Sequence, residues 1–334
     1  MIILFSLSVF VANALTTVSG SDITCTRVIN EPTLDGDLSD WEDVEGATLA
    51  LTGANGALPY AGGDASIKCT YDNNNIYFAF EVPGKYRFNT TDNHLCASIG
   101  TMWKVGQLAD YVNMGGCPVT LGGTYGSKCD GVPETCYPYR VDLGAHWELK
   151  TTEMGVLYEG NRTSGTGNDP IANNDDEYAV TPYCRPDDDD ANAADDWSGA
   201  WLHTSPDSSD GGSYVFEMRR PLTTESVISD VQLYAGETYD FGFAYWDPYE
   251  NEETGWSKAG HYVTGQSQDW ISLTLEEPEE AKEISCSRVF TEPTLDGDLS
   301  DWEDVEGAVI MLTGANGGLP YPGGYSSIKC TYDN

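Results

Sequence analysis

The clearest pattern in the chain is an alternation of apolar and polar residues that is typical of antiparallel strands. It is strongest in SIKCTYDNNNIYFAFEV (residues 66–82), where two alternating runs flank an Asp-Asn-Asn-Asn turn. Such a sequence predicts two half-buried strands joined by a hairpin. The same alternation recurs in GSYVFEMRRPL (212–222), ETYDFGFAYWD (237–247) and DWISLTLEE (269–277).

Helical patterns are weak by comparison. No long stretch keeps the apolar rhythm of about 3.6 residues that marks an amphipathic helix, and Gly and Pro occur throughout, so helices are expected to be short. The fold class predicted is all-β, an antiparallel β-sandwich. Residues 84–212 are rich in Gly, Asp and Cys and contain few strand-like runs. They predict long disulfide-pinned loops at one end of the sandwich, where binding sites commonly lie.

One long segment occurs twice. EPTLDGDLSDWEDVEGA begins at Glu31 and again at Glu292, and the offset stays constant, so that Trp41 corresponds to Trp302. Constant spacing over a whole segment indicates an internal repeat. We therefore expect a signal peptide (1–20), a complete domain (22–276), an acidic linker (277–283) and the start of a second copy (284–334), as in a fragment of a tandem array.

The composition restricts the partners. The chain has 54 acidic and 16 basic residues and a net charge of −38. That charge would repel phosphate backbones and anionic lipid surfaces, so nucleic acid is not an expected partner. The hydrophobic fraction of 40% and the aromatic fraction of 11% exclude a disordered acidic protein and predict a packed core.

The first residues, MIILFSLSVFVANALTTVSGSD, form an apolar run too short to span a bilayer and are followed by small residues suited to cleavage. They predict a secretory signal and a secreted or cell-surface location, with no membrane span. Asn89 in NTT and Asn161 in NRT are candidate glycosylation sites.

The nine cysteines favour disulfides, since none has zinc-like spacing. Cys25 and Cys69 recur together as Cys286 and Cys330, so each couple is expected to pair within its own copy. An odd set then remains, and one of its thiols is expected to be free or bonded to another chain. A covalent c-type haem is excluded by the lack of CxxCH. The odd set comprises Cys96, Cys117, Cys129, Cys136 and Cys184.

Several segments resemble a known family. LDGDLSDWEDVEGA is similar to the opening of family 9 carbohydrate-binding modules and of the related haem-binding subunit of ethylbenzene dehydrogenase and dimethyl-sulfide dehydrogenase. YVFEMRRPLTT, GETYDFGFAYWD and GHYVTGQSQDWISLTL resemble the closing strands of the haem-binding group. Together the resemblance spans most of residues 25–276.

The resemblance implies a β-sandwich that holds one non-covalent haem b between a methionine and a histidine or lysine. Met114 in VNMGGCPV and His261 in KAGHYVTG match the ligand positions best, with Lys258 as the alternative to His261 and His146 as its main rival. Both thioether and imidazole bind haem iron. Gly115 and Gly116 would let the backbone approach the porphyrin.

Other chemistry has less support in the sequence. The acidic runs at 174–178, 185–197 and 207–212 offer oxygen ligands for calcium but lack the spacing of an EF-hand loop, so solvated loops are favoured. No hydrolase, zinc-protease or phosphate-binding motif occurs, and an enzyme is not expected.

Two functions follow from the sequence. The first is a secreted haem protein that transfers electrons or senses redox state with a redox partner protein. The alternative is a repetitive surface or matrix protein that binds an extracellular glycan without haem, on exposed aromatic platforms. Candidate platforms are Trp103, Trp197, Trp201 and Trp256, whereas Trp41, Trp246 and Trp270 are expected in the core.

Overall fold

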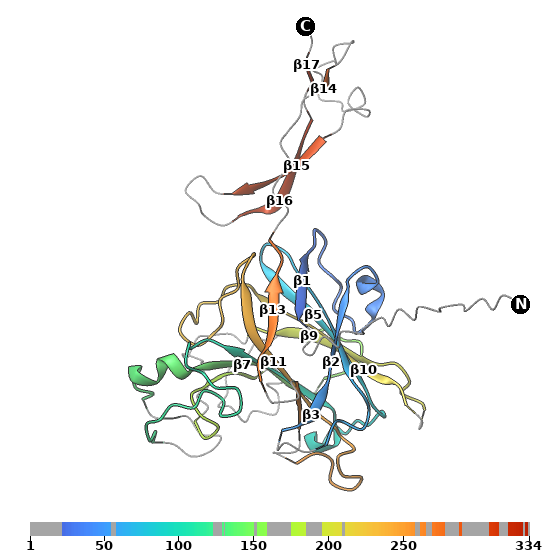
Figure 1. Cartoon of the computed structure of the whole chain (residues 1–334). Helices are drawn as coiled ribbons and strands as arrows, with labels where there is room; N and C mark the ends of the chain where they lie inside the picture. The colour runs from blue at the N-terminus through green and yellow to red at the C-terminus, as the bar shows by residue number, and fades with distance from the viewer. Residues whose placement is uncertain are drawn as a thin grey trace, which may run out of the picture.

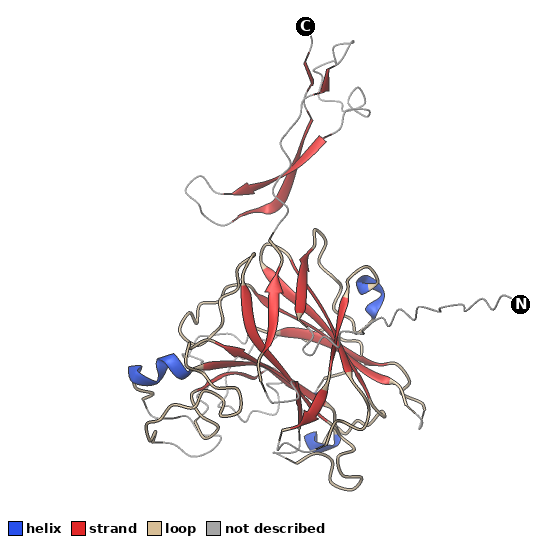
Figure 2. Ribbon diagram, viewed as in Figure 1, coloured by secondary structure: helices blue, strands red, loops and turns tan. Residues whose placement is uncertain are grey.

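A computed structural model gives the fold of the chain (Figures 1 and 2). No helix in the part of the chain it describes is long and apolar enough to cross a membrane. The predicted signal peptide lies outside the described residues, and the domain boundaries stay predictions. Described are residues 22–54, 58–122, 129, 131–149, 152–158, 175–184, 196–208, 211–257, 261–264 and 269–277, together with the backbone of the strands within 287–332.

The all-β prediction is confirmed, because strands form one continuous curled sheet with very little helix. One half of this sheet has the strand order β8-β7-β6-β11-β13-β1. Its strands are β1 (Ile23–Arg27), β6 (Ser98–Lys104), β7 (Val141–Glu148), β8 (Asp175–Ala179), β11 (Thr238–Trp246) and β13 (Ile271–Leu275).

The other half continues from β1 in the order β1-β4-β5-β10-β9, with β2 beside β4. The predicted hairpin is present, since β4 and β5 pair in register from Ser66 and Glu81 to Tyr71 and Ile76. Its strands are β2 (Gly46–Leu49), β4 (Ala65–Tyr71), β5 (Asn75–Pro83), β9 (Ser198–His203) and β10 (Ser213–Pro221).

Strand β1 joins the two halves, since its first residues pair in parallel with β13 and its last residues pair in parallel with β4. The halves fold over a shared core in which aromatic rings of β5 and β11 stack. Phe80 and Phe243 lie 4.5 Å apart between ring centroids, and Phe78 and Phe241 lie 6.0 Å apart. Contacts of this kind between two inner faces define a β-sandwich.

Two short strands and three short helices complete the described part of the domain. Strand β12 pairs with both β11 and β3 and so extends the first half of the sheet. The helices are short 3-10 helices of three to six residues, as the scattered Gly and Pro predicted. These elements are β3 (Leu51–Gly53), β12 (Tyr262–Thr264), η1 (Leu38–Trp41), η2 (Asn93–Leu95) and η3 (Glu134–Tyr139).

The repeated motif around Trp41 covers the outer face of the second half of the sheet. Trp41 is fully buried in a small cluster with Leu34, Tyr77 and Ala200. Gly36 permits this approach: its φ is +84°, and an added Cβ would lie 2.7 Å from atoms of Leu202 and the Trp201 backbone. The motif therefore has a packing role, and its glycine cannot be replaced without strain.

Residues 84–212 contain more regular structure than the sequence suggested, because β6, β7, β8 and β9 all lie there. The prediction of long loops holds for the segments between these strands. Two disulfides pin the loops, Cys117–Cys136 and Cys129–Cys184, and Cys96 is the remaining thiol of the odd set, fully buried.

The predicted Cys25–Cys69 disulfide is confirmed. Cys286 and Cys330 lie outside the described residues, but the backbone around them repeats the first copy. Ser287 pairs with Thr331 as Thr26 pairs with Thr70, and Gly307 pairs with Lys329 as Gly46 pairs with Lys68. The strands are β14 (Ser287–Arg288), β15 (Gly307–Thr313), β16 (Pro320–Lys329) and β17 (Thr331–Tyr332).

Candidate functional site

The expected haem ligand Met114 is part of a packed loop. Its backbone N–H donates to the Tyr111 carbonyl oxygen, at 3.3 Å between N and O, and its φ is 45°. Its side chain packs against a cluster that contains Ala109, Val141 and Leu143. Met114 therefore fills a gap beneath the loop, a common use of methionine.

The two glycines after Met114 serve backbone packing. Gly115 has a φ of +107°, and an added Cβ would overlap the Tyr139 carbonyl oxygen and lie within 2.8 Å of the Val180 backbone. Gly116 has a φ of +74°. The space beside Gly115 is thus occupied by protein backbone, which leaves no room there for a porphyrin.

His261 lies far from Met114. Its ring stacks on Trp246 at 4.8 Å between centroids, and its carbonyl oxygen accepts a hydrogen bond from the Ala54 N–H. Trp246 pairs with the first residue of β6, whereas Val141, which belongs to the cluster against which Met114 packs, pairs with the last. At about 3.3 Å per residue these ends of β6 are roughly 20 Å apart. One iron could not bond to both side chains.

The haem b prediction is therefore wrong. The described residues contain no group of three or more His, Cys, Asp or Glu side chains able to hold a metal ion. Lys258 and much of the acidic runs lie outside the described residues, as does the side chain of His146, which belongs to β7. The expectation of a redox partner rested on haem and loses its basis.

Most of these tryptophans lie differently from the sequence prediction. Trp103, Trp197, Trp201 and Trp256 were expected as exposed platforms, but each is at most 5% exposed. Trp41 is in the core as expected. Trp246 and Trp270 were also expected there, but both are partly exposed.

Trp246 belongs to a group of aromatic rings at one end of the sandwich, which we call the aromatic end. Its rings come from the loop after β5, from the last residue of β11 and the loop that follows, and from the start of β12, at the lower end of the molecule in Figure 1. All are partly or largely exposed. The aromatic end comprises Tyr86, His94, Trp246, Tyr249, His261 and Tyr262.

More deeply buried rings support the aromatic end from below. Trp256 lies 4.5 Å from His94 and 6.2 Å from Trp246 between centroids. Tyr60 lies 4.7 Å from Tyr262, and its hydroxyl donates to the Pro83 carbonyl oxygen. Because these supports are buried, the exposed rings are held in place rather than free to rotate.

Arg87 ties two of the three segments together. One terminal nitrogen donates to the carbonyl oxygens of Pro248 and Asn251, at 2.7 and 3.4 Å, and the other donates to that of Glu252 at 3.0 Å. The guanidinium also lies 5.1 Å from the centre of the Tyr249 ring. A planar group with a fork of donors is suited to this clamp, which a lysine could not reproduce.

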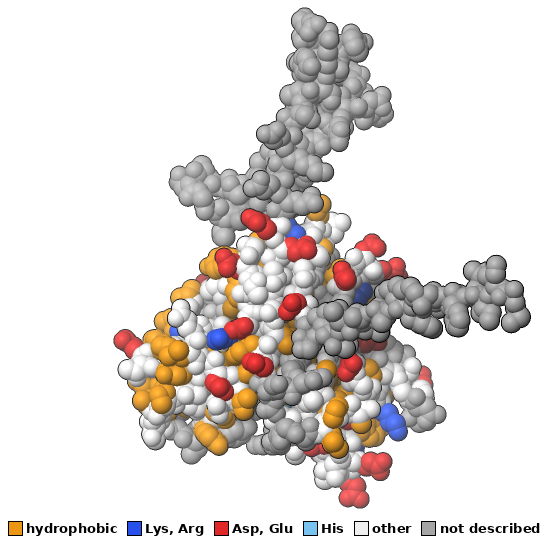
Figure 3. Space-filling view, in the orientation of Figure 1, with side chains coloured by type: hydrophobic (Ala, Val, Ile, Leu, Met, Phe, Trp, Pro, Cys, Tyr) orange, Lys and Arg blue, Asp and Glu red, His pale blue; other side chains and the backbone are white. Residues whose placement is uncertain are grey.

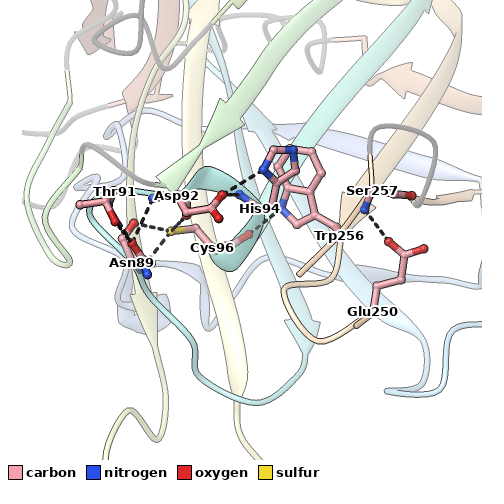
Figure 4. A network of polar contacts seen from close by, with 8 residues as sticks. All are labelled: Asn89, Thr91, Asp92, His94, Cys96, Glu250, Trp256 and Ser257. Atoms are coloured by element: carbon pink, nitrogen blue, oxygen red, sulfur yellow. Dashed lines mark hydrogen bonds and ion pairs between the residues drawn. The ribbon is translucent and has the colours of Figure 1, made fainter. Parts of the chain in front are cut away.

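A second set of contacts joins the same loops, as Figure 4 shows. Asp92 accepts from the backbone N–H of His94 and contacts its Nδ1 at 2.9 Å, and the Trp256 indole N–H donates to the Cys96 carbonyl oxygen at 2.8 Å. The Cys96 thiol donates to the Asn89 carbonyl oxygen. The loop after β5 is thus held from within and against Trp256.

Negative charge borders the aromatic end. Burial raises the pKa of Asp247, helped by the charge of Glu250 and opposed by Arg87 and a hydrogen bond from the Tyr249 N–H. Burial also raises the pKa of Tyr262, and the charges of Asp247 and Glu250 raise it further. The charges of both carboxylates thus act on the Tyr262 hydroxyl.

Trp270 is the other partly exposed tryptophan of the described residues, and it lies outside the aromatic end. It meets Tyr111 edge-on at 5.0 Å between centroids and packs against the cluster that also holds Met114. The Tyr111 hydroxyl donates to the Thr264 carbonyl oxygen, and burial raises its pKa to about 12. The Trp270 backbone N–H donates to the Asp269 carboxylate, whose charge also raises the pKa of Tyr111.

The glycosylation candidates remain predictions. Asn161 lies outside the described residues. Asn89 lies in the loop after β5, where its side-chain oxygen accepts hydrogen bonds from the N–H and hydroxyl groups of Thr91 and from the N–H of Asp92. The sequon is therefore in a local turn beside the aromatic end.

Comparison with known proteins gives remote structural neighbours. No protein-family model and no curated protein matches the sequence. Two solved structures of a family 9 carbohydrate-binding module from Caldicellulosiruptor kristjanssonii are similar in structure. The one with cellotriose is 11% identical with a TM-score of 0.33 over 81% of this chain and 99% of its own. The one with glucose is 12% identical with a TM-score of 0.34 over 77% and 97%.

A third neighbour is a candidate carbohydrate-binding protein from Bacteroides uniformis, 9% identical with a TM-score of 0.38 over 77% of this chain and all of its own. None of the three is described as a haem protein.

Proposed function

We propose that the chain is a glycan-binding protein rather than an enzyme, that it acts outside the cell, and that it binds sugar at the aromatic end. The observation that carries the proposal is the position of Trp246. This large ring is partly exposed and is held by Trp256 and His261 at 6.2 and 4.8 Å between centroids. A fixed aromatic face is a suitable surface for the apolar face of a pyranose ring.

The surroundings of Trp246 supply the polar groups that such a site needs. Asp247 and Glu250 follow Trp246 in the chain, and His94 lies 4.5 Å from Trp256 between ring centroids, so these side chains offer acceptors and donors to sugar hydroxyls. Sugar sites commonly combine a few aromatic faces with a small number of placed polar groups.

An extracellular location fits the covalent structure. Three disulfides lie among the described residues, Cys25–Cys69, Cys117–Cys136 and Cys129–Cys184. Disulfides of this density persist in oxidising compartments and are rare in the cytosol.

The test compares two partly exposed tryptophans. Binding to soluble polysaccharides is screened by affinity electrophoresis and quantified by calorimetry for the native chain, for Trp246→Ala and for Trp270→Ala. We expect Trp246→Ala to weaken binding about tenfold or more, since a stacking surface contributes on the order of 1.5 kcal/mol. Trp270→Ala should bind as the native chain does.

Thermal unfolding of both variants shows whether a loss of binding comes from the missing aromatic ring or from an unfolded protein. Loss of binding in Trp270→Ala with retention in Trp246→Ala would place the site elsewhere. A folded chain that binds no member of a broad glycan panel would refute the proposed function.

A further inference from the structure

A buried histidine packs against the aromatic end from within the core. His203, the last residue of β9, is 1% exposed and lies opposite Tyr214 of β10, at 4.7 Å between ring centroids. The same imidazole lies 5.2 Å from the ring of Tyr86, which belongs to the aromatic end. His203 therefore supports one of the exposed rings from inside the sandwich.

Two backbone contacts determine which nitrogen of His203 carries its hydrogen. The Ser205 N–H lies 3.1 Å from Nδ1, and since a backbone N–H can only donate, Nδ1 must accept. Nε2 lies 3.0 Å from the Gly84 carbonyl oxygen, which can only accept, so Nε2 carries the hydrogen. The ring is therefore neutral in this arrangement, with both nitrogens bonded.

The segment that begins at Gly84 carries Tyr86 and Arg87 to the aromatic end. Besides the bond from the imidazole, the Tyr214 hydroxyl holds this segment from the core, because it accepts from the Arg87 N–H at 2.7 Å. On the outer side, the Tyr86 carbonyl oxygen accepts from the Tyr249 hydroxyl at 3.3 Å, and Arg87 clamps the loop after β11. A shift at Gly84 would therefore be passed on to the exposed rings.

A second proton on His203 would disrupt this arrangement. It must bind Nδ1, where it faces the Ser205 N–H, and two donors cannot bond to each other. Gly212 leaves little room for adjustment, since an added Cβ there would lie 2.7 Å from the ring Cε1 and 3.0 Å from the Ser205 Cβ. Either the ring turns away from Gly84, or the backbone around Ser205 and Gly212 moves. The second change also affects Gly84, because its N–H donates to the Gly212 carbonyl oxygen at 2.9 Å.

The surroundings of His203 place this change in the acidic range. Burial lowers the pKa of His203 from its ordinary 6.5, although its hydrogen bond to a carbonyl oxygen favours the charged ring. The titratable groups around it in the described part of the chain are Tyr86 and Tyr214, which pack on the ring, and Cys96 and Asp207, which act on Tyr86. The net charge of −38, with carboxylates spread over the face in Figure 3, attracts protons to the molecule. The ring is therefore neutral above pH 6.5 and becomes charged as the pH falls below that value.

Resting on the proposed function, we propose that His203 is a positioning residue of the aromatic end, which binds glycan while the ring is neutral and releases it when the ring is protonated. His203 does not touch the sugar in this arrangement. It acts through Gly84 and Tyr86, and so makes glycan binding by the folded chain sensitive to acid.

The test follows glycan affinity from pH 7.5 to pH 5 by calorimetry, with a polysaccharide that the native chain binds in the screen described above. Affinity of the native chain should fall about tenfold, as the loss of one hydrogen bond would give. His203→Gln keeps an amide that can donate to Gly84 but does not titrate in this range. This variant should bind within a few-fold of the native chain at pH 7.5 and keep that affinity at pH 5.

Two further measurements identify the group that titrates. In NMR spectra of the native chain, the His203 imidazole signals, assigned by their absence in His203→Gln, should change at the same pH as the affinity. His94→Gln and His261→Gln remove the partly exposed imidazoles of the aromatic end, and each should keep the fall in affinity on acidification. Thermal unfolding at both pH values shows that the chains compared are folded.

The outcomes distinguish this inference from the proposed function. Affinity that stays constant from pH 7.5 to pH 5 would refute the role of His203 and leave glycan binding intact. A fall in affinity that persists in His203→Gln, disappears in His94→Gln or His261→Gln, or occurs while the His203 ring stays neutral would also overturn it. A folded chain that binds no glycan at any pH would count against the proposed function as well.

Discussion

The indole Nε1 of Trp41 donates a hydrogen bond of 2.5 Å to the carboxylate of Glu217, which is fully buried on β10. The other oxygen of the same carboxylate accepts the backbone N–H groups of Asp35 and Gly36, at 2.9 and 2.5 Å. One side chain of β10 thus fixes the repeated LDGDLSDW motif, which comes from the opposite end of the domain sequence.

Replacing this carboxylate by an amide should destabilise the domain. Glu217→Gln keeps the size but turns one acceptor into a donor that faces an N–H group, so we expect the free energy of unfolding to fall by about 1–3 kcal/mol. Urea unfolding followed by tryptophan fluorescence measures this. The matched control is Glu81→Gln on neighbouring β5, which should change stability by less than about 0.5 kcal/mol. Equal effects of the two changes would show that the network contributes nothing specific.

The same residue makes stability depend on pH. Burial raises the pKa of Glu217 from its ordinary 4.5 to about 7, although the hydrogen bonds from Trp41, Asp35 and Gly36 lower it. The folded state then binds more protons than the unfolded state between these values, so this contribution to stability is complete below about pH 4.5 and is lost as the pH rises through 7. Unfolding measured from pH 4.5 to 7.5 should show this loss, and Glu217→Gln should flatten it. A slope of the same size in the variant would contradict the assignment.

A buried ion pair joins the two halves of the sheet. Arg220 on β10 donates to Asp142 on β7 at 3.0 Å, and both side chains are 1% exposed. Asp142→Asn leaves the guanidinium charge in the interior, which should lower the unfolding free energy by about 3 kcal/mol or more. Asp240→Asn breaks the partly exposed pair with Lys104 and should cost less than about 1 kcal/mol. Comparable losses of unfolding free energy in the two variants would mean that burial does not determine how strongly each ion pair stabilises the fold.

The clamp made by Arg87 should matter for binding more than for folding. Arg87→Lys can satisfy fewer of the three carbonyl oxygens at once, so the loop after β11 should loosen around Tyr249 and Glu250. We expect glycan affinity to fall several-fold, with little change in the unfolding midpoint. The control is Lys85→Ala, which lies at an exposed position of the loop after β5 that also carries Arg87. Affinity that does not change in Arg87→Lys would show that the loop is held by other contacts.

The alternation of apolar and polar residues was enough to predict most of the strands. The runs at 66–82, 212–222, 237–247 and 269–277 each became strands, because a period of two is enforced directly by burial of one face. The strands missed within 84–212, such as SIGTMWK and SGAWLH, show little alternation of apolar and polar residues in their sequence. Their burial depends on the partners that cover them, and those partners are distant in sequence.

The candidate site was predicted less well than the strands, although the sequence around Trp246 already indicated that its side chain lies outside the core. In β11 the buried rings are Phe241, Phe243 and Tyr245, so alternation alone places Trp246 on the opposite face. The family resemblance instead drew attention to Met114 and His261. Nothing local in the sequence indicates that these residues lie at opposite ends of β6, since that separation is set by strand pairing.

The matching registers of the two copies create a competition during folding. SIKCTYDN is identical at 66–73 and 327–334, so β5 meets two segments with the same pairing surface. The short turn at 72–74 favours the first, because each doubling of loop length costs about 0.6 kcal/mol in closure entropy. In two neighbouring chains that advantage disappears, and an exchanged strand would satisfy β5 equally well. The short connection along the chain, rather than a difference in side chains, therefore determines which segment pairs with β5.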